Sequence, residues 1–286
     1  MADARTEELL RALAPLPVET VTATMRNPKS VAERTFRGTA LLRYAVLTGV
    51  VSDQQISSAL VSGYFVVTAA DGVRVAVSVA EARAHGAGRI ILATEQDGEP
   101  LEVGVRLVVP DAPGLAGRSL TEVVGVEFHD LAPDVTPVPT TSSSTITLTG
   151  LLDRPGPVET AAFSTGDLVD VVTEDVAGHG GSRVASRAYA GMRVYDLLDG
   201  AGIRLDPAAR EDFLSKIVVA RGADGYPVVI AGGEIEPRFR AIQMIAATRR
   251  AGAPLGDEGP VRLVVPGDGG PGRWVRGLVS LELREG

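Results

Sequence analysis

Cysteine is absent from this 286-residue chain, and histidine and aromatic residues are scarce. Without a thiol, the chain can form no disulfide, no thiolate metal site and no cysteine-based active site. The three histidines, His85, His129 and His179, show neither the i, i+4 spacing nor the neighbouring carboxylates of a zinc site. The sequence therefore predicts no bound metal.

Long apolar runs and an excess of positive charge are missing too. No apolar run approaches the roughly 18 residues that a membrane span requires, so we expect no membrane partner. The net charge of −8 and the pI near 5.0 argue against nucleic acid as a partner, because phosphates attract basic surfaces. The first residues, MADARTEELLRAL, predict an amphipathic helix and not a secretory signal, so we expect a cytoplasmic protein.

An internal repeat is the most prominent feature that the sequence does contain. Matching segments recur 153 to 156 positions further along the chain and keep their order. The pairs are 36–42 with 189–195, 70–72 with 223–225, and 106–110 with 262–266. Collinear matches at a nearly constant offset are typical of a repeated unit, so the sequence predicts a tandem duplication.

A segment rich in proline, serine and threonine separates the two copies. It lacks apolar periodicity, which is typical of a semi-extended linker. We place the first copy at 1–132, the linker at 133–144 and the second copy at 145–286. Residues 145–150, TITLTG, alternate in polarity and predict a strand that the first copy lacks.

Both copies predict the same order of elements, with strands more numerous than helices. Short helices are expected at 7–13 and 41–48 in the first copy, and at 165–171 and 194–201 in the second. The glycine-rich segment 267–272 fits G-x-G-x-x-G, but we interpret it as a turn because a strand and not a helix follows. Since no βαβ alternation is present, the pattern predicts an α+β fold.

The end of the second copy resembles a known family. Residues 258–267, EGPVRLVVPG, and 272–282, GRWVRGLVSLE, resemble the molybdopterin-binding domain of the sulfite oxidase family. The segments 191–198, 224–226 and 247–255 are similar to that family in the same order. The resemblance implies an α+β fold of mainly mixed sheets, here as two tandem domains related by a pseudo-twofold axis. It also implies a monomer with an internal pseudo-dimer, or a homodimer.

Departures from the family pattern occur where the cofactor would bind. The family holds molybdenum through a pterin dithiolene and one cysteine, and the matching positions here are Val176 in the second copy and Met25 in the first. Valine is no ligand, and a thioether is only a weak one. Glu258 stands in place of the family's motif histidine. The resemblance therefore implies the fold, and we expect no cofactor, with molybdopterin as the alternative.

These features favour a cofactor-free enzyme that binds a small apolar or polyfunctional metabolite in the former cofactor cleft. Shape and a few hydrogen bonds suit cyclisation, rearrangement or isomerisation, as in secondary metabolism. The expected catalytic residues are Asp224, Tyr226, His179 and Tyr195. The expected substrate-binding residues are Met25, Val176, Arg262, Arg273, Trp274 and Arg276, whose arginines keep the basic pattern of the family.

Two other functions stay open from the sequence. One is a molybdopterin-dependent oxidoreductase with atypical metal ligation, and the other is a non-catalytic small-molecule-binding protein. The equivalent residues Arg106 and Arg262 have a structural alternative as well, because an arginine at a strand position often forms a salt bridge.

Overall fold

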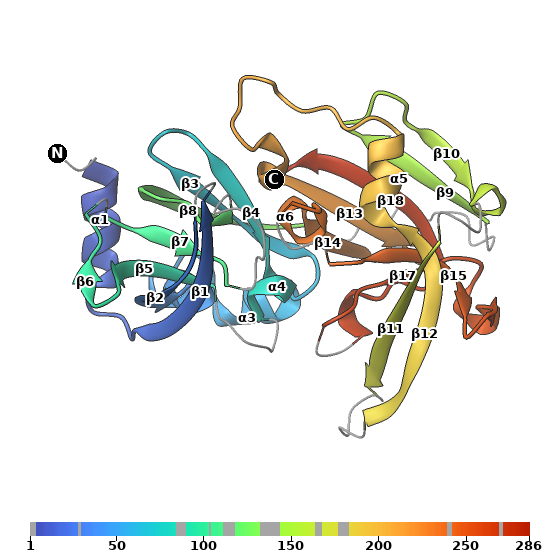
Figure 1. Ribbon diagram of the computed structural model, residues 1–286, viewed down its shortest axis with the longest axis horizontal. Helices are drawn as coiled ribbons and strands as arrows, with labels where there is room; N and C mark the ends of the chain where they lie inside the picture. The colour runs from blue at the N-terminus through green and yellow to red at the C-terminus, as the bar shows by residue number, and fades with distance from the viewer. Residues whose placement is uncertain are drawn as a thin grey trace.

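The computed structural model describes residues 4–27, 30–83, 90–102, 104–110, 118–131, 144–163, 168–176, 183–238, 242–268 and 271–286. We call residues 4–131 the first half and residues 144–286 the second half, which lie beside each other (Figure 1). None of the helices in these ranges has the length and apolar character to cross a membrane.

The first half contains four short helices and eight strands among its described residues. The helices are α1 (Ala4–Leu13), α2 (Leu41–Leu47), α3 (Asp53–Ser58) and α4 (Val79–Arg83). The strands are β1 (Glu19–Asn27), β2 (Ser30–Ala40), β3 (Gly63–Ala69), β4 (Arg74–Ser78), β5 (Ile91–Gln96), β6 (Glu99–Pro100), β7 (Arg106–Val108) and β8 (Val123–Asp130).

The second half has a similar series with two extra strands at its start. Its helices are α5 (Val194–Gly200) and α6 (Gly232–Ile235), with short 3-10 turns that include η4 (Asp212–Ser215). Its strands are β9 (Thr145–Gly150), β10 (Gly156–Glu159), β11 (Val169–Val176), β12 (Arg183–Arg193), β13 (Lys216–Gly222), β14 (Pro227–Ala231), β15 (Ile245–Arg250), β16 (Ala253–Pro254), β17 (Arg262–Val264) and β18 (Leu278–Glu285).

The strands of the two halves pair in the same order. In the first half, one sheet runs β1-β2-β5-β6 with β7 paired to β5, and the other runs β4-β3-β8. In the second half, the matching sheets run β11-β12-β15-β16 with β17 paired to β15, and β14-β13-β18. Strand β9 adds to β18 in parallel and β10 adds to β9, which confirms the extra strand expected at 145–150. The α+β class is confirmed, whereas the pseudo-twofold arrangement stays a prediction.

A close backbone crossing recurs at equivalent glycines. A Cβ atom on Gly38 of β2 would lie 2.1 Å from the Leu92 carbonyl oxygen, and one on Gly191 of β12 would lie 2.2 Å from the Ala246 carbonyl oxygen. The strand register shifts at both places. Only glycine allows two backbones to approach this closely, so the sequence match around 36–42 and 189–195 has a steric cause.

The halves meet through the sheet that contains β3 and β4 in the first half and the sheet that contains β13 and β14 in the second. Strand β3 is buried on both faces, because Phe65 points into the core of the first half while Tyr64 and Val66 pack against the second half. Their partners there are Val219 of β13 and Val229 of β14, among other apolar residues. A strand covered on both faces has no polar side, which explains why β3, β4, β13 and β14 are apolar runs without alternation.

Each half contributes one buried ion pair to this junction. Arg118 donates to both carboxylate oxygens of Glu81, at 2.6 and 2.8 Å. Arg273 of the second half lies 2.7 Å from a carboxylate oxygen of Glu234 and 2.7 Å from one of Asp268. Glu81 and Glu234 are 153 positions apart, the same offset as the sequence repeat. Because both pairs are almost fully buried, each charge depends on its partner for solvation.

The two ion pairs are connected across the junction. The hydroxyl of Ser78, in the first half, donates to Glu234 at 2.8 Å and lies 3.4 Å from Arg273, both in the second half. A Cβ on Gly233 would lie 2.4 Å from the Nε of Arg118, so α6 packs directly on the guanidinium of the other half. Burial raises the pKa of Glu234, and the charge of Arg273 opposes this rise.

Several expectations about individual elements are corrected. The helix expected at 165–171 is wrong, because Val169 to Val171 belong to β11 and pair with residues 189–191 of β12; residues 164–167 lie outside the described ranges. Helix α3 was missed although Ser52 and Gln55 form a capping box, with each backbone amide bonded to the other's side chain. The linker at 133–144 lies outside the described residues apart from Ser144.

Candidate functional site

Two of the expected substrate-binding residues lie together in the second half. Arg262 of β17 is buried, with its guanidinium carbon 5.0 Å from the centroid of the Trp274 ring. Its Nη1 lies 2.7 Å from a carboxylate oxygen of Glu258, so Arg262 forms the salt bridge that was its structural alternative. The Trp274 indole donates to the carbonyl of Val265 at 2.8 Å. The Arg262 guanidinium is therefore ion-paired within the protein, although its Nε has no hydrogen-bond partner among the described residues, and the Trp274 indole N–H is satisfied.

The surroundings of Glu258 bear on the cofactor that the resemblance implies. This buried carboxylate is bonded to Arg250 and Arg262, and Arg187 lies 3.9 Å away. A phosphate group placed here would meet a carboxylate that already occupies the arginines, so these residues do not fit molybdopterin. No group of three or more histidine, aspartate or glutamate side chains in the described ranges could hold a metal ion.

The three arginines expected to bind substrate do not converge. Arg273 belongs to the buried junction with Glu234 and Asp268. Arg276 is exposed, and only its backbone contacts Arg262, through an isolated bridge. A cradle for one anion requires several guanidinium groups around the same point, so this set does not form one.

The expected catalytic residues are also in separate places. The Asp224 carboxylate accepts a hydrogen bond from the backbone amide of Tyr226 at 3.0 Å, which closes the turn between β13 and β14, and the Tyr226 side chain is exposed. Tyr195 of α5 packs edge-on against Phe213, with ring centroids 5.7 Å apart. Burial raises the pKa of Tyr195. The structure therefore brings Asp224 and Tyr226 together in one turn. Their hydrogen bond stabilises the backbone of that turn.

Three expected residues lie beyond what can be described in full. Met25 lies two residues before the end of β1 and Val176 ends β11, and their side chains are outside the described part of the structure. His179 lies between β11 and β12, entirely outside the described residues. Their assigned roles stay predictions.

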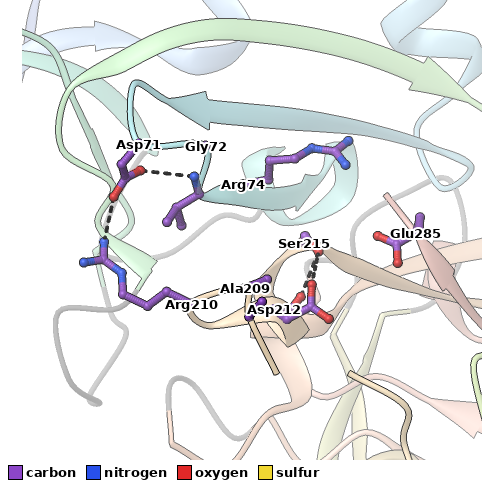
Figure 2. A pocket seen from close by; sticks show the side chains of 10 residues that line it. Asp71, Gly72, Arg74, Ala209, Arg210, Asp212, Ser215 and Glu285 are labelled. Atoms are coloured by element: carbon purple, nitrogen blue, oxygen red, sulfur yellow. Dashed lines mark hydrogen bonds and ion pairs between the residues drawn. The ribbon is translucent and has the colours of Figure 1, made fainter. Parts of the chain in front are cut away.

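A polar pocket lies where the two halves meet. It has a volume of about 310 Å³. The first half contributes the β3–β4 turn and the start of β4, and the second half contributes η4, the loop before it and the end of β18 (Figure 2). The lining residues are Asp71, Gly72, Val73, Arg74, Ala208, Ala209, Arg210, Asp212, Ser215 and Glu285. We call this the junction pocket.

Charged groups of both signs surround the junction pocket. On one side, Arg210 of the second half lies 3.4 Å from Asp71 of the first half, and Figure 2 shows the two side chains facing each other. On the other side, Arg74 donates one hydrogen bond to the backbone carbonyl of Gly286 at 2.8 Å, and Glu285 lies nearby. Arg74 uses one guanidinium nitrogen in this bond, and an arginine has five N–H donors, so it can still bind an anion.

A tight network forms the wall of the pocket on the side of the second half. Lys216 lies 2.7 Å from Asp212 and 2.7 Å from Glu285. The Ser215 hydroxyl donates to the backbone carbonyl of Asp212 at 2.8 Å. Burial by itself would raise the pKa of Asp212, but hydrogen bonds from Lys216 and from the backbone of Asp206 outweigh it and lower the pKa. Asp212 is therefore a charged group that holds the wall in place.

The chemistry of this arrangement suits binding better than proton transfer. A general base needs an available lone pair and a pKa near the working pH. In the junction pocket, the Asp212 pKa is lowered and Lys216 is held between two carboxylates. Ser215 has no histidine beside it among the described lining residues, and its neighbour Lys216 donates to the Ser215 hydroxyl at 3.2 Å instead of accepting its proton.

Sequence reasoning missed the junction pocket, although the repeat contained a signal. Asp224 was selected from an Ala-Asp-Gly turn, and its counterpart 153 positions earlier is Asp71. Asp71 lines the pocket, whereas Asp224 is in the exposed turn of the second half. The other lining residues come from both halves, and no local pattern in the sequence marks them.

Similarity to known proteins is limited. No protein-family model matches the chain, and no curated protein matches it. Among solved structures, the sulfane dehydrogenase SoxCD from Paracoccus pantotrophus matches over 56% of this chain, with 17% identity and a TM-score of 0.38. The match spans 42% of that protein's chain. A likeness of this size establishes neither a cofactor nor a reaction for the present chain.

Proposed function

We propose that this protein binds a small zwitterionic metabolite in the junction pocket without converting it. The observation that carries the proposal is the polar pocket of about 310 Å³, whose lining presents charges of both signs and comes from both halves. Its volume is at the lower end of ligand pockets, which favours a ligand the size of an amino acid. The two halves are, in this proposal, diverged copies of one unit.

The charges divide the pocket into two ends for such a ligand. Arg74 is half-buried and offers guanidinium donors to a carboxylate. Glu285 has a side chain that is 57% exposed and faces Lys216 on one side, so its solvent side can accept an ammonium group. A ligand with one charge of each sign would satisfy both residues without leaving a charge unpaired.

A matched ligand series tests this proposal by isothermal titration calorimetry. β-Alanine carries both charges, whereas propionate and propylamine each carry one. We expect saturable binding of β-alanine, or of glycine or γ-aminobutyrate in the same assay, and much weaker binding of the singly charged compounds. Binding should also raise the melting temperature, because a ligand that binds only the folded state stabilises it.

Variants at the two ends of the pocket sharpen the test. Arg74→Gln and Glu285→Gln should each weaken zwitterion binding at least tenfold, while Arg37→Gln, an exposed position on β2, should leave it unchanged. If none of the three zwitterions binds saturably at millimolar concentration, or if both pocket variants bind as well as the parent protein, the proposal is wrong.

The two catalytic functions expected from the sequence stay predictions. Molybdenum at near one atom per chain in the purified protein would support the oxidoreductase. Release of a changed product from a bound ligand, detected by mass spectrometry, would support the cofactor-free cyclase or isomerase and contradict simple binding.

A further inference from the structure

A second pocket, unlike the junction pocket, lies entirely in the first half. It has a volume of about 320 Å³, and most of its lining is apolar. Helix α2 provides Leu42, Val46 and Leu47, helix α3 provides Ile56, and Pro17 precedes β1. Helix α2 packs against α4, so the pocket lies among the three short helices α2, α3 and α4, of which α3 and α4 are adjacent in Figure 1. We call this the helix pocket.

The apolar wall of the helix pocket faces solvent. The Leu47 side chain is 56% exposed, although it belongs to a short helix whose other face is buried in the core. Removing exposed apolar surface from water is favourable, so a hydrocarbon group that covered the wall would be held there. Concave apolar surface of this kind is typical of ligand sites.

One cation at the edge of the helix pocket lacks a partner. Arg83 ends α4 and is half-buried, and no described residue offers it a hydrogen bond or an ion pair. The other arginine in the lining, Arg43, lies 3.5 Å from Glu19 and is therefore paired. Asp53 also lines the pocket, but it is exposed at the start of α3. A partly desolvated guanidinium attracts an anion more strongly than an exposed carboxylate attracts a cation.

The second half shows what occupies the corresponding place. Leu42 corresponds to Tyr195 and Arg83 to Glu236, both at the offset of 153. There the Tyr195 ring packs against Phe213 and the Glu236 carboxylate accepts a hydrogen bond from Arg238, so an aromatic partner and a counter-ion come from within the chain. Among the described residues of the first half, Leu42 faces a pocket and Arg83 has no counter-ion.

We propose that the helix pocket binds an amphipathic monocarboxylate. The hydrocarbon body lies against Leu42, Val46 and Leu47, and the carboxylate bonds to the guanidinium of Arg83. The ligand thus supplies the two features that the second half provides with its own side chains. This site is independent of the junction pocket, and the two proposals can fail separately.

Three probes of equal chain length test the site by calorimetric titration below their micelle concentrations. They are octanoate, octanol and octylamine. We expect one octanoate to bind per chain, octanol to bind at least tenfold more weakly, and octylamine to show no saturable binding. Equal affinity for octanoate and octylamine would overturn the role of Arg83, and binding of none of the three would overturn the site.

Substitutions separate the two contributions. Arg83→Gln should weaken octanoate binding at least tenfold and leave octanol binding unchanged, because only the charge is lost. Leu47→Ser should weaken the binding of both octanoate and octanol, and the variant should stay folded because Leu47 is exposed. Arg37→Gln removes an exposed charge elsewhere and Arg74→Gln removes one from the junction pocket, and both should bind octanoate like the parent protein. Unchanged octanoate affinity in Arg83→Gln would refute the proposal.

Discussion

The first and second halves pair their strands in the same order, yet they use several equivalent positions differently. Gly38 and Gly191 make the same close crossing, and Arg118 and Arg273 form equivalent buried ion pairs. At the helices the halves diverge, because Tyr195 of α5 packs against Phe213 in the second half, whereas Leu42 of α2 lines a pocket in the first. Positions under steric or electrostatic constraint are shared, and positions near solvent differ.

The junction wall shows a second difference between the halves. Lys216 begins β13 opposite Glu285 of β18, and the corresponding pair in the first half is Gly63 of β3 opposite Asp130 of β8. Gly63 is required there, because a Cβ would lie 2.8 Å from the carbonyl oxygen of Ala59. The same register therefore carries a charged network in one half and a tight backbone contact in the other. Ligand sites are expected where the halves differ in this way.

The largest loss of stability is expected when one of the two buried ion pairs is broken. Arg273→Met leaves Glu234 and Asp268 without their cation, and we expect a loss of about 3–5 kcal/mol in the free energy of unfolding, measured by urea denaturation at neutral pH. Arg118→Met removes the cation beside a single carboxylate, that of Glu81, and should lose less.

The exposed Arg37→Met is the control, because its ion pair with Glu95 should contribute less than about 1 kcal/mol.

The pH dependence of the unfolding free energy adds a second check. Burial raises the pKa of Glu234 in the folded protein, so the stability from this group is complete below its unfolded pKa and declines as pH rises through the folded pKa. Arg273→Met should raise the pKa of Glu234 further, so the stability deficit of this variant should shrink as the pH falls from neutral into the acidic range. A constant or growing deficit would contradict this account.

The next effect concerns the glycine crossings. Gly38→Ala and Gly191→Ala should each destabilise by about 1–3 kcal/mol or more, because the added methyl group meets a backbone carbonyl that cannot move away. Chemical denaturation of both variants measures the loss. Gly125→Ala, on β8 with open space around it, is the matched control. A large loss of stability in only one of the two variants would show that the crossing stabilises only one half.

A smaller loss of stability is expected at the junction wall, where only the second half has a charged network. Asp212→Asn leaves Lys216 with Glu285 as its only carboxylate, and a loss of about 1–2 kcal/mol is expected at neutral pH. Since the folded pKa of Asp212 is lowered, the stability it contributes is present above its unfolded pKa and is lost as pH falls through the folded pKa. The free energies of unfolding of the variant and the parent protein, plotted against pH, should therefore converge in acid. The exposed Asp170→Asn serves as control, and curves that stay parallel would disprove the assignment.

The smallest effect is expected at the exposed link between the halves. The side chains of Arg210 and Asp71 are 70% and 51% exposed at a separation of 3.4 Å. Arg210→Gln should change the free energy of unfolding by less than about 1 kcal/mol, and the difference should vanish near 1 M salt, where the screening length is about 3 Å. Thermal melts at low and high salt measure it. A loss as large as that of Arg273→Met would mean that the surface pair, and not the buried pairs, joins the halves.

Much of the architecture was predictable from local patterns. The Asp-Gly turns, the helices before Gly49 and Gly202 and the apolar strands follow from turn chemistry and periodicity over a few residues. The long strands β2 and β12 were not predicted, although each pairs with the strand just before it and also with a strand further along the chain. The expected site residues followed the resemblance to a cofactor-binding cleft, and the charged groups around Arg262 and Arg273 are instead paired within the protein.

Much of the order of strands and short helices follows from the sequence alone, since hydrophobic period and glycine placement act within neighbouring residues. Which charges have partners depends instead on how distant parts of the chain pack together. Ser78 and Glu234 are 156 positions apart, and their contact depends on how one half packs against the other. The same packing forms the junction pocket and pairs Arg273, while Arg83 in the first half stays unpartnered among the described residues. Contacts at such separations are set by the whole fold, because no short-range pattern records which side chains it brings together.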